Sequence, residues 1–174
     1  DAATRVRADA VAARLRELAG LAAKLMQLAR AQGARLLLDA PVDAAPALRL
    51  VVEEARRADG LGDRLVATFP DAPILSRIDP DALAILLRNL IENAARHGAA
   101  DAPVVARFSG GGFVVVNRGP VAPADAMAGL TAPFQRGAGE APGAGLGLAI
   151  AAAIARETGA TLTLASPAPG QEDG

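Results

Sequence analysis

Residues 89–98 (NLIENAARHG) bring together the side chains of this sequence that could do chemistry. On a helix, Asn89, Asn93 and Arg96 would share one face, because they follow one another at intervals of four and three residues. An amide at such a place must find a partner or stay in contact with water, because burying it unpaired costs about 1–3 kcal/mol. Two interpretations are open. The amides either are satisfied at an interface, or they form the wall of a ligand site, with an amide oxygen for a hard cation and Arg96 for phosphate.

The flanking residues predict that this run is helical. Asp79 is a good N-cap, Pro80 suits the first helical position, and Gly98 suits the position just after the C-terminus. Apolar residues recur between them at helical spacing: Leu83, Leu86, Leu87, Leu90 and Ala94. The sequence therefore predicts a helix whose apolar stripe faces a core, with the polar face beside it.

A second stretch, residues 143–159 (GAGLGLAIAAAIARETG), is a glycine-rich turn that runs directly into a predicted helix. Glycines at 143, 145 and 147 would let the backbone approach a ligand closely, and the helix N-terminus would offer free N–H groups to an anion. The stretch lacks the Lys-Ser/Thr of a P-loop and the preceding strand of a dinucleotide fold. A plain glycine hinge at the start of a helix is the alternative interpretation.

Together the two stretches resemble the nucleotide-binding boxes of sensor histidine kinases, whose ATPase fold is shared with gyrase, Hsp90 and MutL. Residues 89–98 resemble the asparagine box of that family, and residues 143–148 resemble its second glycine box. The two boxes also follow one another in the family's order. The resemblance implies ATP and Mg2+ as ligands and phosphoryl transfer as the chemistry.

The resemblance also implies a role for each matched residue. Asn93 would bind Mg2+, Asn89 would support the metal or its water, and Arg96 would contact phosphate. His97 stands where the family often has Tyr and would pack near the nucleotide, the alternative being an ordinary capping histidine at a helix end. The second glycine box adds these nucleotide-binding positions: Gly143, Gly145, Leu146, Gly147 and Leu148.

The family's first glycine box, Asp-x-Gly-x-Gly, is matched only in part by residues 114–123 (VVVNRGPVAP). Asn117 stands at the position of the Asp that accepts a hydrogen bond from the adenine amino group, and Gly119 at the first glycine. Val121 stands at the second glycine and removes backbone freedom there. An Asn can still accept through its side-chain oxygen but lacks the charge that strengthens such a bond. Alternatively, Asn117 merely ends a strand.

A long segment at residues 119–145, rich in Gly, Pro and Ala, indicates a functional lid more than an ordinary connection. Within it, residues 133–137 (PFQRG) resemble the family's phenylalanine box. The resemblance implies that Phe134 packs the lid onto the body and that Arg136 reaches the terminal phosphate. The alternative is an ordinary loop with one buried Phe.

Residues 1–33 predict one long helix that ends at Gly33. Its apolar residues step by four and three along a coiled-coil-like seam: Val11, Leu15, Leu18, Ala22, Leu25 and Ala29. Leu21 and Leu28 widen this stripe. The resemblance makes this helix the second of the dimerisation and phosphotransfer domain; the first, with the phosphorylated histidine, would lie before Asp1. A helix that packs on its own domain is the alternative.

The predicted fold is an α/β sandwich of the Bergerat ATPase type. One mixed sheet of about five strands packs on three helices, preceded by the bundle helix. Residues 1–33 form the partial dimerisation helix, and residues 34–174 form the ATP-binding domain. The predicted strands are residues 35–38, 64–69, 74–78, 104–108, 113–117 and 161–165, with a loop at 39–46 and further helices at 46–58 and before Gly159.

Composition excludes several classes of protein. The chain has no Cys and one His, so neither a thiolate metal site nor a Ser-His-Asp triad is expected. A net charge of −1 and 2% aromatic residues argue against a nucleic acid partner. No apolar run reaches the roughly 18 residues of a membrane span, so we expect no direct membrane contact. The chain reads as an excised cytoplasmic piece of a longer protein, whose parent could be a membrane-anchored sensor.

Three functional hypotheses remain open. The first is the ATP-binding part of a two-component sensor histidine kinase, which would transfer the γ-phosphate to a histidine absent from this chain. Homodimerisation through a helical bundle and a response regulator as partner come with it. The second is a degenerate kinase-like module that docks a response regulator without using ATP. The third is a serine kinase of the anti-sigma type, against which the long first helix argues. The sequence reveals neither the signal sensed nor the cognate regulator.

Overall fold

The computed structural model describes residues 2–33, 35–58, 61–109, 111–127, 129–134 and 145–168. Two of the predicted nucleotide-binding residues, Arg136 and Gly143, lie outside these ranges. The part of the predicted lid between Phe134 and Gly145 lies outside them as well.

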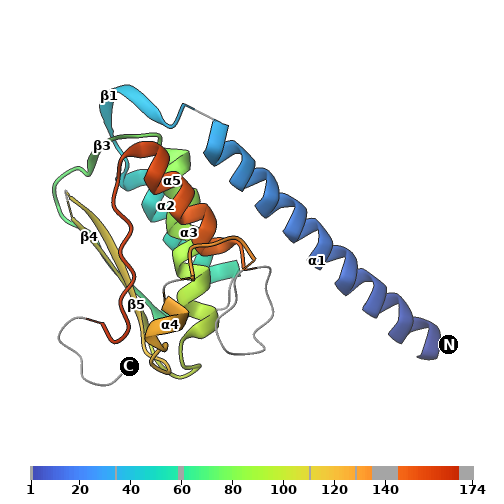
Figure 1. Ribbon diagram of the computed structural model, residues 1–174. Helices are drawn as coiled ribbons and strands as arrows, with labels where there is room; N and C mark the ends of the chain where they lie inside the picture. Colours follow the sequence, from blue (N-terminus) through green and yellow to red (C-terminus); the bar gives the residue numbers. More distant parts are fainter. Residues whose placement is uncertain are drawn as a thin grey trace.

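Five strands form two sheets at one side of the fold (Figure 1). Strand β1 (Leu37–Asp43) pairs antiparallel with β3 (Leu75–Ile78). Strand β4 (Val104–Ser109) lies between β2 (Leu65–Thr68), to which it is parallel, and β5 (Gly112–Asn117), to which it is antiparallel. The expected number of strands and their mixed pairing are therefore confirmed, although the hydrogen bonds divide the strands into two sheets where one was expected.

Three helices pack against the strands: α2 (Ala45–Ala58), α3 (Pro80–His97) and α5 (Gly147–Thr158). In α3 the cap is as predicted, with the Asp79 carboxylate accepting a hydrogen bond from the Asp81 N–H at 2.7 Å and Pro80 in the first turn. Two short helices add to the predicted set, η1 (Gly62–Arg64) and α4 (Ala124–Met127). The α/β sandwich is confirmed.

Helix α3 runs through the middle of the core. Its Leu87 and Ile91 are fully buried among side chains of α2 and of the β2–β4–β5 sheet. On another side of the same helix, Leu86 packs with Ile150 and Ile154 of α5. A helix held by apolar contacts on two sides has little freedom to rotate or slide, so the polar residues along it are fixed in place.

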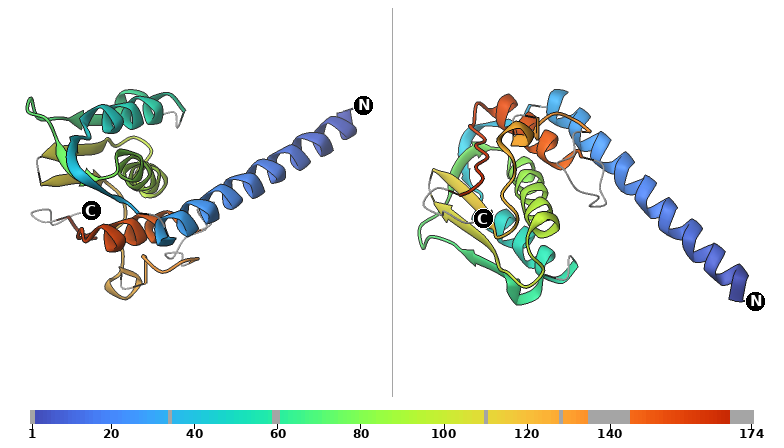
Figure 2. Two further views of the ribbon diagram at one scale, coloured as in Figure 1. Left: turned by 90° about the horizontal axis from the view of Figure 1, so that it is seen from above. Right: turned by 60° about the horizontal axis from the view of Figure 1, so that its bottom comes forward.

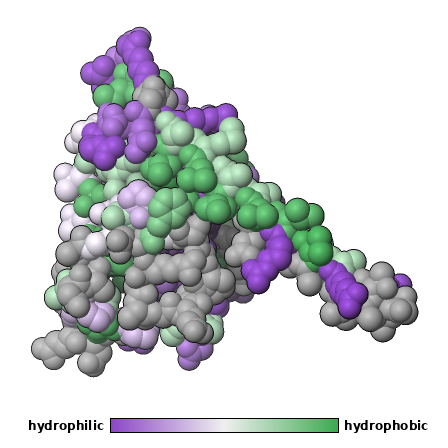
Figure 3. All heavy atoms as spheres, turned by 45° about the vertical axis from the view of Figure 1, so that its right-hand side comes forward, coloured by the Kyte–Doolittle hydropathy of each residue, from purple (hydrophilic) through white to green (hydrophobic). Residues whose placement is uncertain are grey.

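Helix α1 (Ala2–Gly33) extends away from the body over its N-terminal half (Figures 1 and 2). Its C-terminal part contacts α5, where Leu21, Leu28 and Ala31 pack against the core. The predicted seam lies on the exposed side: Val11, Leu15, Leu18 and Leu25 are between 41% and 61% exposed. Figure 3 shows apolar residues in green continuing from the body along this helix. The flanking leucines of the predicted stripe therefore belong to a docked face of α1, whereas the seam itself forms an open face.

Two predictions of local structure are wrong. The loop expected at residues 39–46 is largely strand, since β1 runs to Asp43. The proline that suggested a loop, Pro41, lies between Leu37 and Val42, where the ladder register shifts, and such irregular positions are where strands tolerate proline. Residues 161–165, predicted as a final strand, join no ladder. They keep only the alternation of exposed and half-buried side chains that suggested a strand.

None of the helices described by the structure is both long and apolar enough to span a membrane.

Candidate functional site

Asn89 is the only buried polar side chain in the described part of the chain, with 3% of its surface exposed. Its amide NH2 donates to the Ile85 carbonyl one turn earlier at 2.8 Å. The Oδ1 atom lies on the other side of the same planar amide, so it points away from the Ile85 carbonyl, to which it could not hydrogen-bond because both are acceptors. This Oδ1 atom finds no donor among the described residues. A buried acceptor without a donor costs about 1–3 kcal/mol, so a cation or a water-bearing ligand fits this position.

The N-terminus of α5 lies directly against this oxygen. A Cβ atom added to Gly147 would lie 3.2 Å from the Asn89 Oδ1 atom, tighter than an ordinary contact. Gly147 is therefore needed for close approach of the two predicted boxes. Leu146, the N-cap residue of α5, makes no side-chain hydrogen bond to the first turn. The first-turn N–H groups of α5 remain available to an anion beside Asn89.

Leu146 and Leu148, named with the second glycine box, have their side chains in the core. Leu146 is 1% exposed and belongs to the apolar cluster under α5, and Leu148 is also buried. Only their backbone groups can therefore contribute to a ligand site. Gly145, just before them, has a φ of 65°, a left-handed conformation that glycine adopts without strain.

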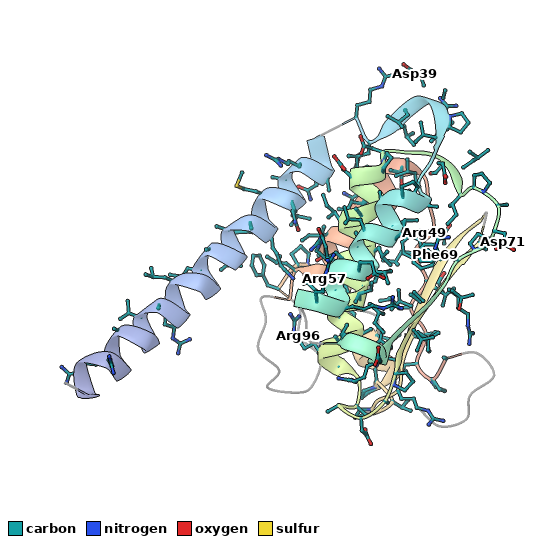
Figure 4. The ribbon with its side chains drawn as sticks, turned by 180° about the vertical axis from the view of Figure 1, so that it is seen from behind. Asp39, Arg49, Arg57, Phe69, Asp71 and Arg96 are labelled. Atoms are coloured by element: carbon teal, nitrogen blue, oxygen red, sulfur yellow. The ribbon has the colours of Figure 1, made fainter. Side chains whose placement is uncertain are left out.

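Asn93 and Arg96 continue the polar face of α3 beyond Asn89. Asn93 is half-buried and Arg96 is exposed. Figure 4 shows Arg96 near the lower end of α3, as drawn there. Because Asn93 lies one turn beyond Asn89, its amide can face the same ligand. The three predicted side chains thus run from a buried amide to an exposed guanidinium.

His97 ends α3 with an exposed side chain. Partial desolvation, and next the positive charge of Arg96, lower the pKa of His97 below its ordinary value of 6.5. His97 is therefore neutral at pH 7 and can pack against an uncharged ring or accept a hydrogen bond.

The C-terminal end of α3 packs tightly on the partial first glycine box. A Cβ atom on Gly98 would lie 2.6 Å from the Ala94 carbonyl oxygen and 3.2 Å from the Asn117 Cβ atom. A Cβ atom on Gly119 would lie 2.6 Å from the His97 carbonyl oxygen. Gly98 has a φ of −77°, so its role is close approach and not the left-handed helix end that its position suggested. Asn117 is half-buried at the end of β5, beside the end of α3.

Phe134 lies beside the second glycine box but does not pack as expected. Its backbone N–H donates to the Gly145 carbonyl at 3.1 Å, which joins an inner residue of the predicted lid to its C-terminal end. Its side chain, however, is 62% exposed, and its φ is 64°, unusual for a residue with a Cβ atom. The expectation that Phe134 packs the lid onto the body is therefore not met in this structure.

An ion pair that the sequence did not reveal joins α1 to α3. The Lys24 ammonium lies 2.5 Å from a carboxylate oxygen of Glu92, with 23% and 26% of the two side chains exposed. Glu92 stands next to Asn93, and no role could be assigned to it from the sequence. No local pattern signals this pair, because its members are 68 residues apart.

The donor set decides how a cation could be held. The described residues contain no group of three or more His, Cys, Asp or Glu side chains that could hold a metal ion. A cation at Asn89 and Asn93 would therefore have one or two amide oxygens from the protein, with water and phosphate oxygens completing its shell. Mg2+ bound next to a nucleotide uses such a shell, so the residues present fit it.

Comparison with known proteins agrees with this arrangement. The family model described as "Histidine kinase-, DNA gyrase B-, and HSP90-like ATPase" matches residues 78–173. The chain is 32% identical over 154 residues to the sensor protein CseC of Streptomyces coelicolor, covering 74% of this chain and 30% of the relative. It is 31% identical over 187 residues to the signal transduction histidine-protein kinase AfsQ2 of the same organism, covering 94% of this chain and 34% of the relative. The chain thus spans about a third of the length of these relatives.

Among solved structures, the chain resembles full-length ShkA in complex with AMPPNP. The TM-score is 0.60 at 30% sequence identity, with 82% of this chain and 31% of that chain covered.

Proposed function

The chain belongs to the family of histidine kinase-, DNA gyrase B- and HSP90-like ATPases, as a catalytic ATP-binding domain of the sensor histidine kinase type, and we propose that it binds Mg-ATP for phosphoryl transfer to a histidine. The observation that carries the proposal is the buried oxygen of Asn89, which has no donor among the described residues and lies against the N-terminus of α5, whose N-cap residue makes no side-chain hydrogen bond. An acceptor for a cation and a set of N–H donors for an anion meet there. The AMPPNP complex of ShkA supports the same ligand class.

Each residue of the site has a place in this proposal. The first-turn N–H groups of α5 and the guanidinium of Arg96 bind the phosphates, and the amide oxygens of Asn89 and Asn93 hold Mg2+. Asn117 lies at the end of the site that would hold the adenine base, called the base end below, and accepts a hydrogen bond from the adenine amino group. Bound Mg2+ neutralises phosphate charge, and the residues of the chain position the nucleotide for in-line attack. Arg136 and Gly143 keep the roles that the resemblance implies.

The accepting histidine is supplied from outside this sequence. The sequence contains one histidine, His97, at the end of α3 beside the base end of the site. We assign it to packing near the nucleotide, because its backbone lies against Gly119, close to the strand end that carries Asn117. Incubated alone with labelled ATP, the chain should therefore acquire no acid-labile label at His97.

Mg-ATP binding tests the proposal directly. A fluorescent ATP analogue should bind saturably in the presence of Mg2+, and Asn93→Ala should abolish the Mg2+ dependence. Asp81→Ala, an exposed change at the other end of α3, is the control and should bind as the wild type does. Absence of binding at millimolar ligand would instead favour the degenerate docking module. That alternative draws on Asn117 and Val121, which replace the family's Asp and second Gly in the first glycine box.

We further propose that α1 is one arm of a dimerising helical bundle. Its open face carries Leu15 and Leu18, each about 60% exposed, whereas its docked face already contacts α5. A helix with so much apolar surface is stabilised by a partner. A homodimer, a response regulator as partner and a cytoplasmic location of this domain belong to the same proposal.

Sedimentation tests the bundle. The wild-type chain should self-associate, and Leu15→Glu with Leu18→Glu should make it monomeric. Val66→Glu, at an exposed valine of β2, is the matched control. A wild-type chain that stays monomeric at high concentration would contradict the bundle while leaving the ATP site untouched.

A further inference from the structure

Arg64 reaches across the fold to the turn that follows α3. It is the last residue of η1, directly before β2. Its Nη2 group donates to the Ala99 carbonyl at 2.8 Å, and its Nε group donates to the Ala102 carbonyl at 3.1 Å. We propose that Arg64 is a positioning residue for the base end of the nucleotide site, which it controls through the turn at residues 99–102. This inference rests on the proposed function.

The turn is connected to the base end by hydrogen bonds. The Ala102 N–H donates to the Ala99 carbonyl at 3.2 Å, which closes the turn, so Ala99 accepts from both Ala102 and Arg64. The Ala99 N–H in turn donates to the Arg118 carbonyl at 2.7 Å. Arg118 follows Asn117 directly. One residue, Ala99, therefore receives the guanidinium on one side and holds the backbone beside Asn117 on the other.

Close packing makes this connection stiff. Gly98, which precedes the turn, approaches Asn117 so closely that a Cβ atom on it would lie 3.2 Å from the Asn117 Cβ atom. Gly119 approaches the His97 carbonyl in the same way, at 2.6 Å. With no slack between the end of α3 and the strand end, a displaced turn displaces Asn117.

The other end of the connection is anchored in the core. Leu61 and Leu65, on either side of η1, are both buried. The Arg64 N–H donates to the Leu61 carbonyl at 2.9 Å, and the Leu65 carbonyl accepts two N–H groups from Arg56 of α2, at 3.1 and 3.0 Å. The backbone of Arg64 is thus held in place by the core, as the backbone of a positioning residue must be.

The chemistry of the contact selects arginine. Two carbonyls on one side of a turn match the planar fork of a guanidinium, which offers several N–H donors in a fixed geometry. A lysine ammonium, which is a compact point charge on a flexible stem, can reach the same carbonyls but cannot fix their relative orientation. Arg64→Lys should therefore restore only part of the function that Arg64→Met removes.

A double-mutant cycle on ATP affinity tests the inference in the full chain. If loss of the two Arg64 hydrogen bonds lowers the population of the binding-competent turn to about a tenth, Arg64→Met weakens Mg-ATP binding about tenfold. Asn117→Ala removes the base contact itself. Because Arg64 acts through Asn117, the double variant should bind little worse than Asn117→Ala alone. Arg77→Met, which removes a guanidinium bond to the Leu38 carbonyl in the β1–β3 ladder, is the control and should bind ATP as the wild type does.

Hydrogen exchange of the Ala99 amide gives a second readout that needs no nucleotide. Exchange at Ala99 should become faster in Arg64→Met and stay unchanged in Arg77→Met. Unchanged ATP affinity in a folded Arg64→Met chain would overturn the inference alone. So would additive losses, with the double variant binding about tenfold more weakly than Asn117→Ala, because they would show that Arg64 does not act through Asn117. A wild-type chain that binds no ATP would overturn the proposed function, and this inference with it.

Discussion

Replacing Asn89 with Leu should leave the nucleotide-free protein about as stable as the wild type while abolishing Mg-ATP binding. Leu has the same branched heavy-atom skeleton as Asn but no polar atoms. The substitution removes the hydrogen bond to the Ile85 carbonyl, a loss of about 1 kcal/mol, and adds about 1 kcal/mol for two methyl groups against Gly147. It also removes the burial cost of the unpartnered Oδ1 atom, about 2 kcal/mol. These contributions cancel to within about 1 kcal/mol.

Thermal unfolding measures both halves of this prediction. Without nucleotide, the Tm of Asn89→Leu should lie within about 4 °C of the wild type, since 1 kcal/mol corresponds to about 2–4 °C for a chain of this size. With Mg-ATP at a hundred times its Kd, the wild type should gain about 2.7 kcal/mol and the variant nothing. Asn89→Ala serves as a companion variant. It removes the same polar groups but leaves space behind, so it should be less stable than Asn89→Leu and equally unable to bind.

Two results would refute the reasoning. A loss of more than about 3 kcal/mol in nucleotide-free Asn89→Leu would mean that the amide is structurally satisfied and that its oxygen is not held ready for a ligand. A nucleotide-induced shift as large as that of the wild type would mean that the cation and phosphates bind elsewhere.

Three further predictions concern the base end, the contact with α1 and the end of α3. Asn117→Asp should raise ATP affinity up to about tenfold and leave GTP affinity unimproved, because a carboxylate strengthens the bond to an amino group but repels a 6-oxo group. If titration shows the same ratio of ATP to GTP affinity in the variant as in the wild type, Asn117 only ends a strand. Lys24→Met should cost about 1 kcal/mol in urea unfolding, and exchanging the charges of Lys24 and Glu92 should restore part of it; no change would mean that this ion pair does not hold α1. Because the pKa of folded His97 is lowered, the unfolded chain binds a proton first, so stability falls as pH drops below about 6.5. His97→Gln should weaken that pH dependence of Tm between about pH 7.5 and pH 5.5.

The elements of the fold follow from local patterns in the sequence. Helix α3 was predictable because its cap, its first-turn proline and its apolar stripe all lie within residues 79–98. The β4–β5 hairpin was predictable because two apolar runs flank a glycine turn. The class of the site followed in the same way, since each box is a short run of residues whose types carry its chemistry.

The strands that the sequence mispredicted depend on contacts that are not local. Pro41 indicated a loop, but the partner strand β3 accommodates it at a shift in register. Residues 161–165 alternate as a strand does, yet no neighbouring strand offers them a ladder. Alternation and proline are properties of a segment, whereas pairing is a property of two segments, so the first cannot settle the second.

The sequence by itself predicted which residues could hold a nucleotide, because the two boxes are short runs that resemble those of a known ATPase family. The tertiary structure decided where these residues lie and how deeply each is buried. It buried Asn89, left its oxygen without a donor among the described residues, and set Gly147 against that oxygen. It also turned the seam of α1 outward and brought Arg64 to carbonyls 35 and 38 residues away. Each of these facts depends on which surfaces meet when the core closes, and a one-dimensional pattern of residues does not contain that information.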